Sequence, residues 1–263
     1  MSLRSPLSNA FAAALLCAAA SAHAQGKPMD DAALSDTWGQ ALLDLTNTSQ
    51  GGYDFSRLTF NADVSLSMTL SGLKLGTYDY AARNGTGSDI DISTMSFGRS
   101  DLGDSARTVA ITNPYFEWVY SGAVGSADRQ VVGMRVGFGG ITGDVGLAMN
   151  SVSGALTINT ANGVVSSAND TALNGKRWDG LAGCAGCTTA LSQIGGVTAG
   201  DANGASRDFF LSVLKSALTY PTTNTALGAP AVSQAGFWLN WTDRLNAINT
   251  TGTVPPNIPK IGP

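Results

Sequence analysis

The chain has 263 residues with a formal net charge of −4, and 43% of its residues are hydrophobic. This hydrophobic fraction is enough for a folded core, and the acidic balance argues against binding to nucleic acid or anionic lipid. With 32 glycines and only 13% charged residues, the composition is typical of an exported β-rich protein.

The first 24 residues have the features of a signal peptide. Arg4 supplies a positive charge, residues 11–20 form an apolar stretch too short to span a bilayer, and residues 22–24 (Ala-His-Ala) form a cleavage site. We expect residues 1–24 to be removed, leaving one mainly β domain over 25–263. No later apolar run reaches the ~20 residues of a transmembrane helix, so we expect none after cleavage.

A helix is expected from about Asp30 to Leu45, because apolar residues recur there at helical spacing. One long strand is expected from Leu58 to Leu70, where every second residue is apolar. Gly72 then shifts this alternation, as a β-bulge would.

A further strand carries Asp89 and Asp91, which would project from the same face. Two carboxylates in this arrangement could share a calcium ion. Because the EF-hand spacing and other oxygen-ligand motifs are absent, we expect a solvent-exposed strand face instead, and calcium binding stays an open alternative.

More strands follow. One begins at Val109 and is bounded by Pro114, and residues 115–120 are aromatic and extended. Alternating segments over 132–138, 145–149 and 156–158 are separated by glycine- or asparagine-rich stretches, which we interpret as turns. The aromatic residues of 115–120 and 237–241 could form a binding face, although core packing is the more common role of aromatic side chains.

Residues 163–204 are rich in Gly, Ala, Asn and Thr and are expected to form a long loop region. It contains Cys184 and Cys187, which we expect to form a disulfide in an oxidising compartment. A thioredoxin-like redox centre is the alternative, but its βαβ setting is missing. Residues 207–220 could be a strand or a short helix, and residues 250–263 an extended, proline-containing tail.

Few residues suit catalysis. The only histidine, His23, leaves with the signal peptide, so Ser-His-Asp and Cys-His systems are excluded from the mature chain. The only glutamate, Glu117, would have to serve a paired-carboxylate hydrolase, but we expect it to be a surface acid on a strand. We therefore predict a protein without catalytic residues, cofactor or metal ligands, and not an enzyme.

Several segments in the same order resemble a group of poorly characterised exported proteins of Gram-negative bacteria, some of which are assigned to a Fil pilus system. The matching segments are residues 30–41, 89–92, 112–118, 129–135, 208–212 and 236–240. The resemblance extends over most of the mature chain. It implies a place at the cell envelope and envelope or pilus proteins as partners, and it transfers no catalytic residue.

The sequence thus predicts a mainly β fold. Long amphipathic antiparallel strands would form a curled sheet or a sandwich or roll, with short helices near the N- and C-terminal parts. The expected function is binding or assembly in the periplasm, at the outer membrane or on the cell surface. One alternative is a carrier of an apolar ligand in the groove of a curled sheet. A lesser one is an outer-membrane β-barrel, although the strand count is low and aromatic girdles are not evident.

Overall fold

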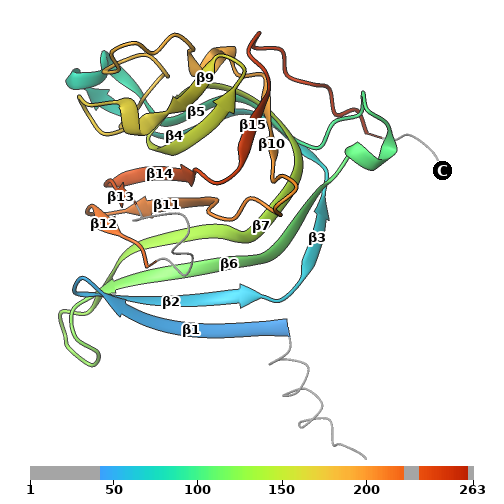
Figure 1. Ribbon diagram of the computed structural model, residues 1–263. Helices are drawn as coiled ribbons and strands as arrows, with labels where there is room; N and C mark the ends of the chain where they lie inside the picture. Colours follow the sequence, from blue (N-terminus) through green and yellow to red (C-terminus); the bar gives the residue numbers. More distant parts are fainter. Residues whose placement is uncertain (1–41, 222–230, 260–263) are drawn as a thin grey trace, which may run out of the picture. The chain divides into compact units, whose positions relative to one another are not determined.

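The computed structural model of the protein describes residues 42–221 and 231–259, which contain 15 β-strands (Figure 1). The strands are β1 (Leu43–Gln50), β2 (Tyr53–Phe60), β3 (Asp63–Leu66), β4 (Met68–Tyr80), β5 (Gly85–Phe97), β6 (Val109–Ser121), β7 (Gln130–Val152), β8 (Gly154–Thr160), β9 (Gly163–Ser166), β10 (Gly196–Ala199), β11 (Phe210–Leu214), β12 (Leu218–Thr219), β13 (Val232–Ser233), β14 (Gly236–Trp241) and β15 (Leu245–Asn249). The predicted mainly β fold class is confirmed.

Short 3₁₀-helices join some of these strands: η1 (Ala81–Arg83), η2 (Asp104–Ala106), η3 (Ser167–Asn169) and η4 (Leu191–Gln193). Within the described ranges, no helix has the length and apolar character needed to cross a membrane.

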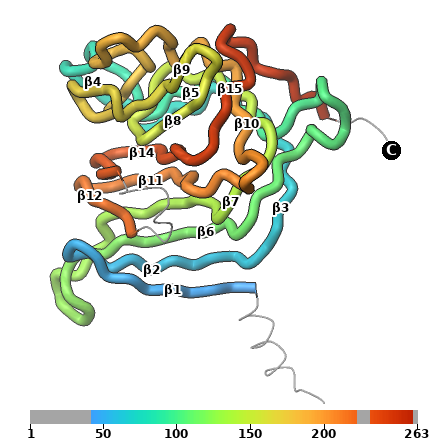
Figure 2. The backbone as a smooth tube through the Cα atoms, in the orientation of Figure 1, coloured from blue at the N-terminus to red at the C-terminus, as the bar shows by residue number. Residues whose placement is uncertain are grey.

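The sheet closes on itself through the longest strand. Its order is β1-β2-β6-β7-β10-β15-β8-β14-β11, and β11 pairs back onto β7, which completes a ring of strands (Figure 2). The first half of β7 pairs with β11 and the second half with β10. Most pairs are antiparallel, as predicted, but β8 is parallel to both β14 and β15. Strands β1, β2 and β6 extend the sheet beyond the ring.

The segments 132–138 and 145–149, predicted as separate strands, belong to the single strand β7. The glycines between them serve close packing rather than a turn. A Cβ atom on Gly139 would lie 2.9 Å from the Asn113 Cβ, and one on Gly140 would lie 2.8 Å from the Thr112 Oγ1. Glycine lets β6 approach β7 closely at this point.

Pro114 does not end its strand, contrary to the prediction, because β6 continues through it to Ser121. On one edge of β6, Thr112 is the last residue to pair with β3, and Tyr115 is the first to pair with β2. Pro114 therefore lies where β6 changes partner, and its missing N–H removes no ladder hydrogen bond there.

The predicted single strand from Leu58 to Leu70 is wrong, because three strands share these residues. The chain leaves β2 after Phe60 and leaves β3 after Leu66, pairing first with β6 and then with β5. The β4–β5 register is the same before and after Gly72, so no residue is inserted into that ladder. A period-two pattern cannot show where a strand changes its neighbour.

The other predicted elements have mixed outcomes. Residues 43–45, placed at the end of the predicted helix, belong to β1, while residues 30–41 of that helix and the signal peptide lie outside the described residues. The predicted loop over 163–204 contains β9 and β10. Residues 207–220 contain strands, and the described part of the tail, 250–259, has no regular element.

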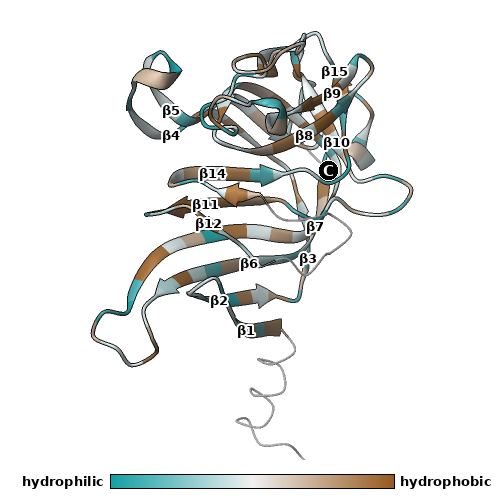
Figure 3. Cartoon of the chain, turned by 60° about the vertical axis from the view of Figure 1, so that its left-hand side comes forward, coloured by the Kyte–Doolittle hydropathy of each residue, from teal (hydrophilic) through white to brown (hydrophobic). Residues whose placement is uncertain are grey.

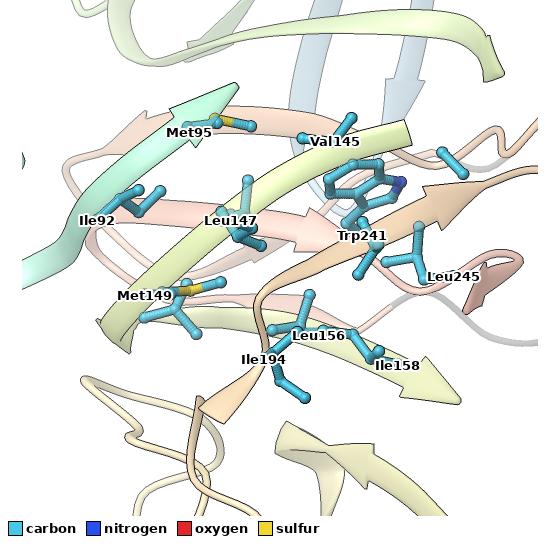
Figure 4. Close-up of a cluster of buried hydrophobic side chains, with 14 of the residues drawn as sticks. Ile92, Met95, Val145, Leu147, Met149, Leu156, Ile158, Ile194, Trp241 and Leu245 are labelled. Carbon is cyan, nitrogen blue, oxygen red and sulfur yellow. The ribbon is translucent and has the colours of Figure 1, made fainter. Parts of the chain in front are cut away.

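Two groups of buried side chains hold the fold together. The larger one joins β5, β7, β8, β10, β14 and β15 and includes Leu147, Leu156 and Trp241 (Figure 4). The smaller one, around Val119, Phe210 and Trp238, lies on the face of the β2–β6–β7–β11–β14 sheet that carries the site described next.

Candidate functional site

Three charged side chains form a row across neighbouring strands. Glu117 on β6 is paired in register with Arg57 on β2 and with Arg135 on β7. The Arg57 Nε donates to the Glu117 Oε2 over 2.7 Å, and the Arg135 Nε donates to the Glu117 Oε1 over 2.6 Å. Glu117 is only 3% exposed and Arg135 only 4% exposed. We call these residues the charged row.

The prediction that Glu117 is a surface acid is therefore wrong. Tyr115, Glu117 and Val119 alternate along β6 and are all buried. The sequence signal for this burial is the position of Glu117 between two core residues. The partners were not predicted, because strand register cannot be read from one strand alone.

Aromatic rings surround the guanidinium groups. Arg57 lies 4.2 Å from the centre of the Tyr115 ring, and Arg135 lies 3.9 Å from that of Tyr220 and 4.8 Å from that of Phe210. These distances are typical of cation–π contacts. Burial raises the pKa of the Tyr115 and Tyr220 hydroxyls, so both stay neutral at physiological pH.

The charged row borders a cavity of about 1030 Å³. Its lining includes Arg57, Arg135, Arg207, Asp208, Tyr115 and Trp238. Gly137 lets the lining residue Tyr115 and the backbone of Phe209 approach β7 closely, because a Cβ there would lie 2.5 Å from the Tyr115 Oη and from the Phe209 carbonyl oxygen. The volume is at the upper end of that of small-molecule sites.

Asp208 is held rigidly at this cavity. It accepts hydrogen bonds from the backbone N–H groups of Thr242 and Asp243 and from the Asn240 side chain, at 2.9–3.0 Å. The Thr242 hydroxyl donates a further bond to it. These donors already occupy both carboxylate oxygens, so Asp208 orients the strand ends and is poorly suited to act as a base.

The opposite face of the same strands carries an apolar patch. Leu45, Leu58 and Phe116 lie side by side on β1, β2 and β6. Trp118, Met134 and Val213 form the next cross-strand line. Phe116 is 42% exposed and Leu45 is 64% exposed, and Leu43, Met134 and Val213 are also exposed. We call these five exposed residues the apolar patch. Figure 3 shows hydrophobic and hydrophilic stretches following one another along β6 and β7.

The patch ends at the edge strand β1. All eight residues of β1 are exposed, and β1 pairs only with β2 among the described strands. An edge strand of this kind presents unpaired backbone N–H and C=O groups, which can add a further strand.

The two candidate calcium ligands have different partners. Asp89 is buried and is bound by the Lys176 Nζ at 2.8 Å, the Tyr78 hydroxyl, the Ser153 hydroxyl and the Phe237 N–H. Asp91 is paired with Lys74 and accepts from the Asn150 side chain. The prediction of a solvent-exposed strand face is thus wrong for Asp89. The described residues contain no cluster of three or more acidic, cysteine or histidine side chains suited to a metal.

The remaining predicted residues also have defined places. Cys184 and Cys187 are joined by a disulfide, with 5.6 Å between their Cα atoms. The aromatic segments mostly pack in the cores, as expected from the usual role of aromatic side chains: Tyr115, Trp238 and Trp241 are buried. Phe116 is exposed. No protein-family model, curated protein or solved structure matches this chain.

Proposed function

We propose that this is an exported, non-catalytic cell-envelope protein that acts in binding or assembly. The observation that carries the proposal is the apolar patch next to the edge strand β1, which pairs only with β2 among the described strands. Monomeric proteins rarely expose contiguous large apolar side chains, and such patches mark interaction sites. A partner strand added to β1 would gain backbone hydrogen bonds, and the apolar side chains of that strand would be buried against the patch.

The partner we propose is a protein of the envelope or of a pilus system that offers an extended segment with apolar side chains. The signal-peptide features of residues 1–24 support export, and the resemblance to the pilus-associated group supports the choice of partner.

The test combines protease shaving of intact cells with affinity capture of the tagged protein from detergent-solubilised envelopes. We expect capture of an envelope protein by wild type and its loss with Leu45→Lys and Phe116→Ser. Val124→Ser is the matched control, because Val124 is 82% exposed but lies outside the strands of the patch. Equal capture by all four proteins would refute the patch as the docking site.

A carrier function is the second candidate, favoured by the cavity beside the charged row. The cavity wall combines arginine and aromatic side chains, so a wholly apolar ligand would leave cations unpaired. The carrier alternative therefore takes a ligand with a polar head.

A further inference from the structure

We infer that the cavity beside the charged row binds a small organic carboxylate with a flat apolar body, and that Arg57 receives the carboxylate. The inference deepens the carrier alternative and is independent of the apolar patch.

The charged row carries an excess positive charge. Glu117 carries one negative charge between two arginines, so the charged row has a net charge of +1. Arg207 and Asp208, which also line the cavity, have opposite charges and leave this sum unchanged. An excess cation at a partly buried site is unfavourable unless an anion compensates it. The site is positive although the whole chain is acidic.

The terminal nitrogens of Arg57 are the hydrogen-bond donors available at the cavity. Glu117 binds the Nε of Arg57, and the Arg57 terminal nitrogens have no hydrogen-bond partner among the described residues. The Arg57 side chain is 24% exposed and lines the cavity. Two terminal nitrogens of one guanidinium match the two oxygens of a carboxylate. Glu117 therefore orients Arg57 and leaves its forked end free.

Two further donors lie in the wall. The Arg135 Nη2 and the Trp238 Nε1 are buried and have no partner among the described residues. Both groups can only donate hydrogen bonds, so the missing partner of each is an acceptor. Both atoms are covered in this structure and would reach a ligand only after a side-chain shift, so we assign the direct contact to Arg57.

The aromatic wall of the cavity indicates the shape of the ligand. Tyr115, Phe210 and Trp238 supply aromatic surface around the cations, and all three line the cavity. Aromatic side chains favour flat apolar groups, which stack on their faces or meet their edges. An arylcarboxylate therefore satisfies both the positive charge and the aromatic wall.

The experiment measures binding of 2-naphthoate and its neutral analogue 2-naphthamide to the purified protein by isothermal titration calorimetry. We expect the carboxylate to bind about tenfold tighter or more, because hydrogen bonds to charged groups are stronger than neutral ones. Arg57→Gln should abolish this preference, and Arg57→Lys should retain part of it because the charge remains.

Lys74→Gln is the control, because it removes one cation that lies outside the cavity lining. Equal affinity for the two probes, binding of neither, or a preference unchanged in Arg57→Gln would overturn the inference. If Arg57→Gln fails to fold, Arg57→Lys and the wild-type comparison still decide. Phe116→Ser should bind the probe like wild type, which separates this inference from the assembly proposal.

Discussion

The two faces of the β2–β6–β7 sheet reverse the usual distribution of polar and apolar residues. On one face, Glu117 and Arg135 are buried and Arg57 is partly buried. On the other, Phe116 and Met134 are exposed although they are apolar. Alternation along β6 and β7 thus separates two chemistries, but it does not tell which face is covered. Which face is buried depends on strands that are distant in the sequence.

Both faces depart from what stability alone would favour. A buried ion group is often no more stabilising than apolar residues of similar volume, and an exposed apolar patch adds little to folding. Both departures agree with the interactions proposed above for the two faces. The experiments below test this from the largest expected effect to the smallest.

The largest effect is expected from Glu117→Gln. This change leaves two guanidiniums without their carboxylate, and breaking a buried ion group costs about 3–5 kcal/mol. Urea unfolding measures the loss in the free energy of unfolding. Val213→Thr on the opposite face is the control and should change it by no more than about 0.5 kcal/mol. Similar losses for both variants would contradict the assigned faces.

Replacing the whole charged row sharpens the comparison. We expect the free energy of unfolding of the triple variant Arg57→Met, Glu117→Leu, Arg135→Met to lie within about 2 kcal/mol of that of wild type, because no charge is left unpaired. It should lose the preference for 2-naphthoate over 2-naphthamide. A stability loss as large as that of Glu117→Gln would show that the row is needed for folding itself.

Neither cysteine lines the cavity or belongs to the apolar patch, so the disulfide should matter less. The double variant Cys184→Ser, Cys187→Ser should lose about 2 kcal/mol or less, because the loop between the two cysteines is very short. Thermal unfolding of both proteins measures the difference. Loss of the fold in the variant, or two reactive thiols in protein from the envelope, would contradict the structural role of this bond.

The smallest effect is expected from the ion pair on the same face as the patch, where the Arg129 Nη1 donates to the Asp54 Oδ2 over 2.6 Å. The hydrogen bond from Arg129, followed by that from Ser49, lowers the pKa of Asp54. A carboxyl with a lowered folded-state pKa stabilises the fold above its ordinary pKa and loses this contribution as pH falls through the lowered value.

Asp54→Asn should therefore lower Tm slightly at neutral pH, and the difference from wild type should vanish on acidification below about pH 4. Thermal unfolding at a series of pH values measures it. A difference that grows as pH falls would contradict the sign of the pKa shift.

Local patterns predicted the strands well where one neighbour lasts for the whole strand. The alternation at Ile90 and Ile92 corresponds to β5. The same reasoning failed from Leu58 to Leu70 and at Pro114, because partner changes depend on the register of another strand. Single-strand patterns contain no information on that register.

The candidate site was predicted only in part. The sequence pointed to Glu117, Asp89 and the aromatic segment 115–120, but not to Arg57 or Arg135 as partners. Arg57 lies 60 positions and Arg135 lies 18 positions from Glu117 in the sequence, and only the sheet brings them together. The exposure of Phe116 was missed for the same reason, since it depends on what the rest of the chain leaves uncovered.

Hydrogen exchange of the β1 amides tests the docking surface most directly. In the purified protein, the amides on the free edge of β1 should exchange rapidly, because they have no partner strand among the described residues. In the complex captured from the envelope, peptides covering Leu43–Gln50 should become protected, while peptides from the centre of β7 stay unchanged. Equal exchange of β1 in the purified protein and in the complex would contradict assembly through this edge.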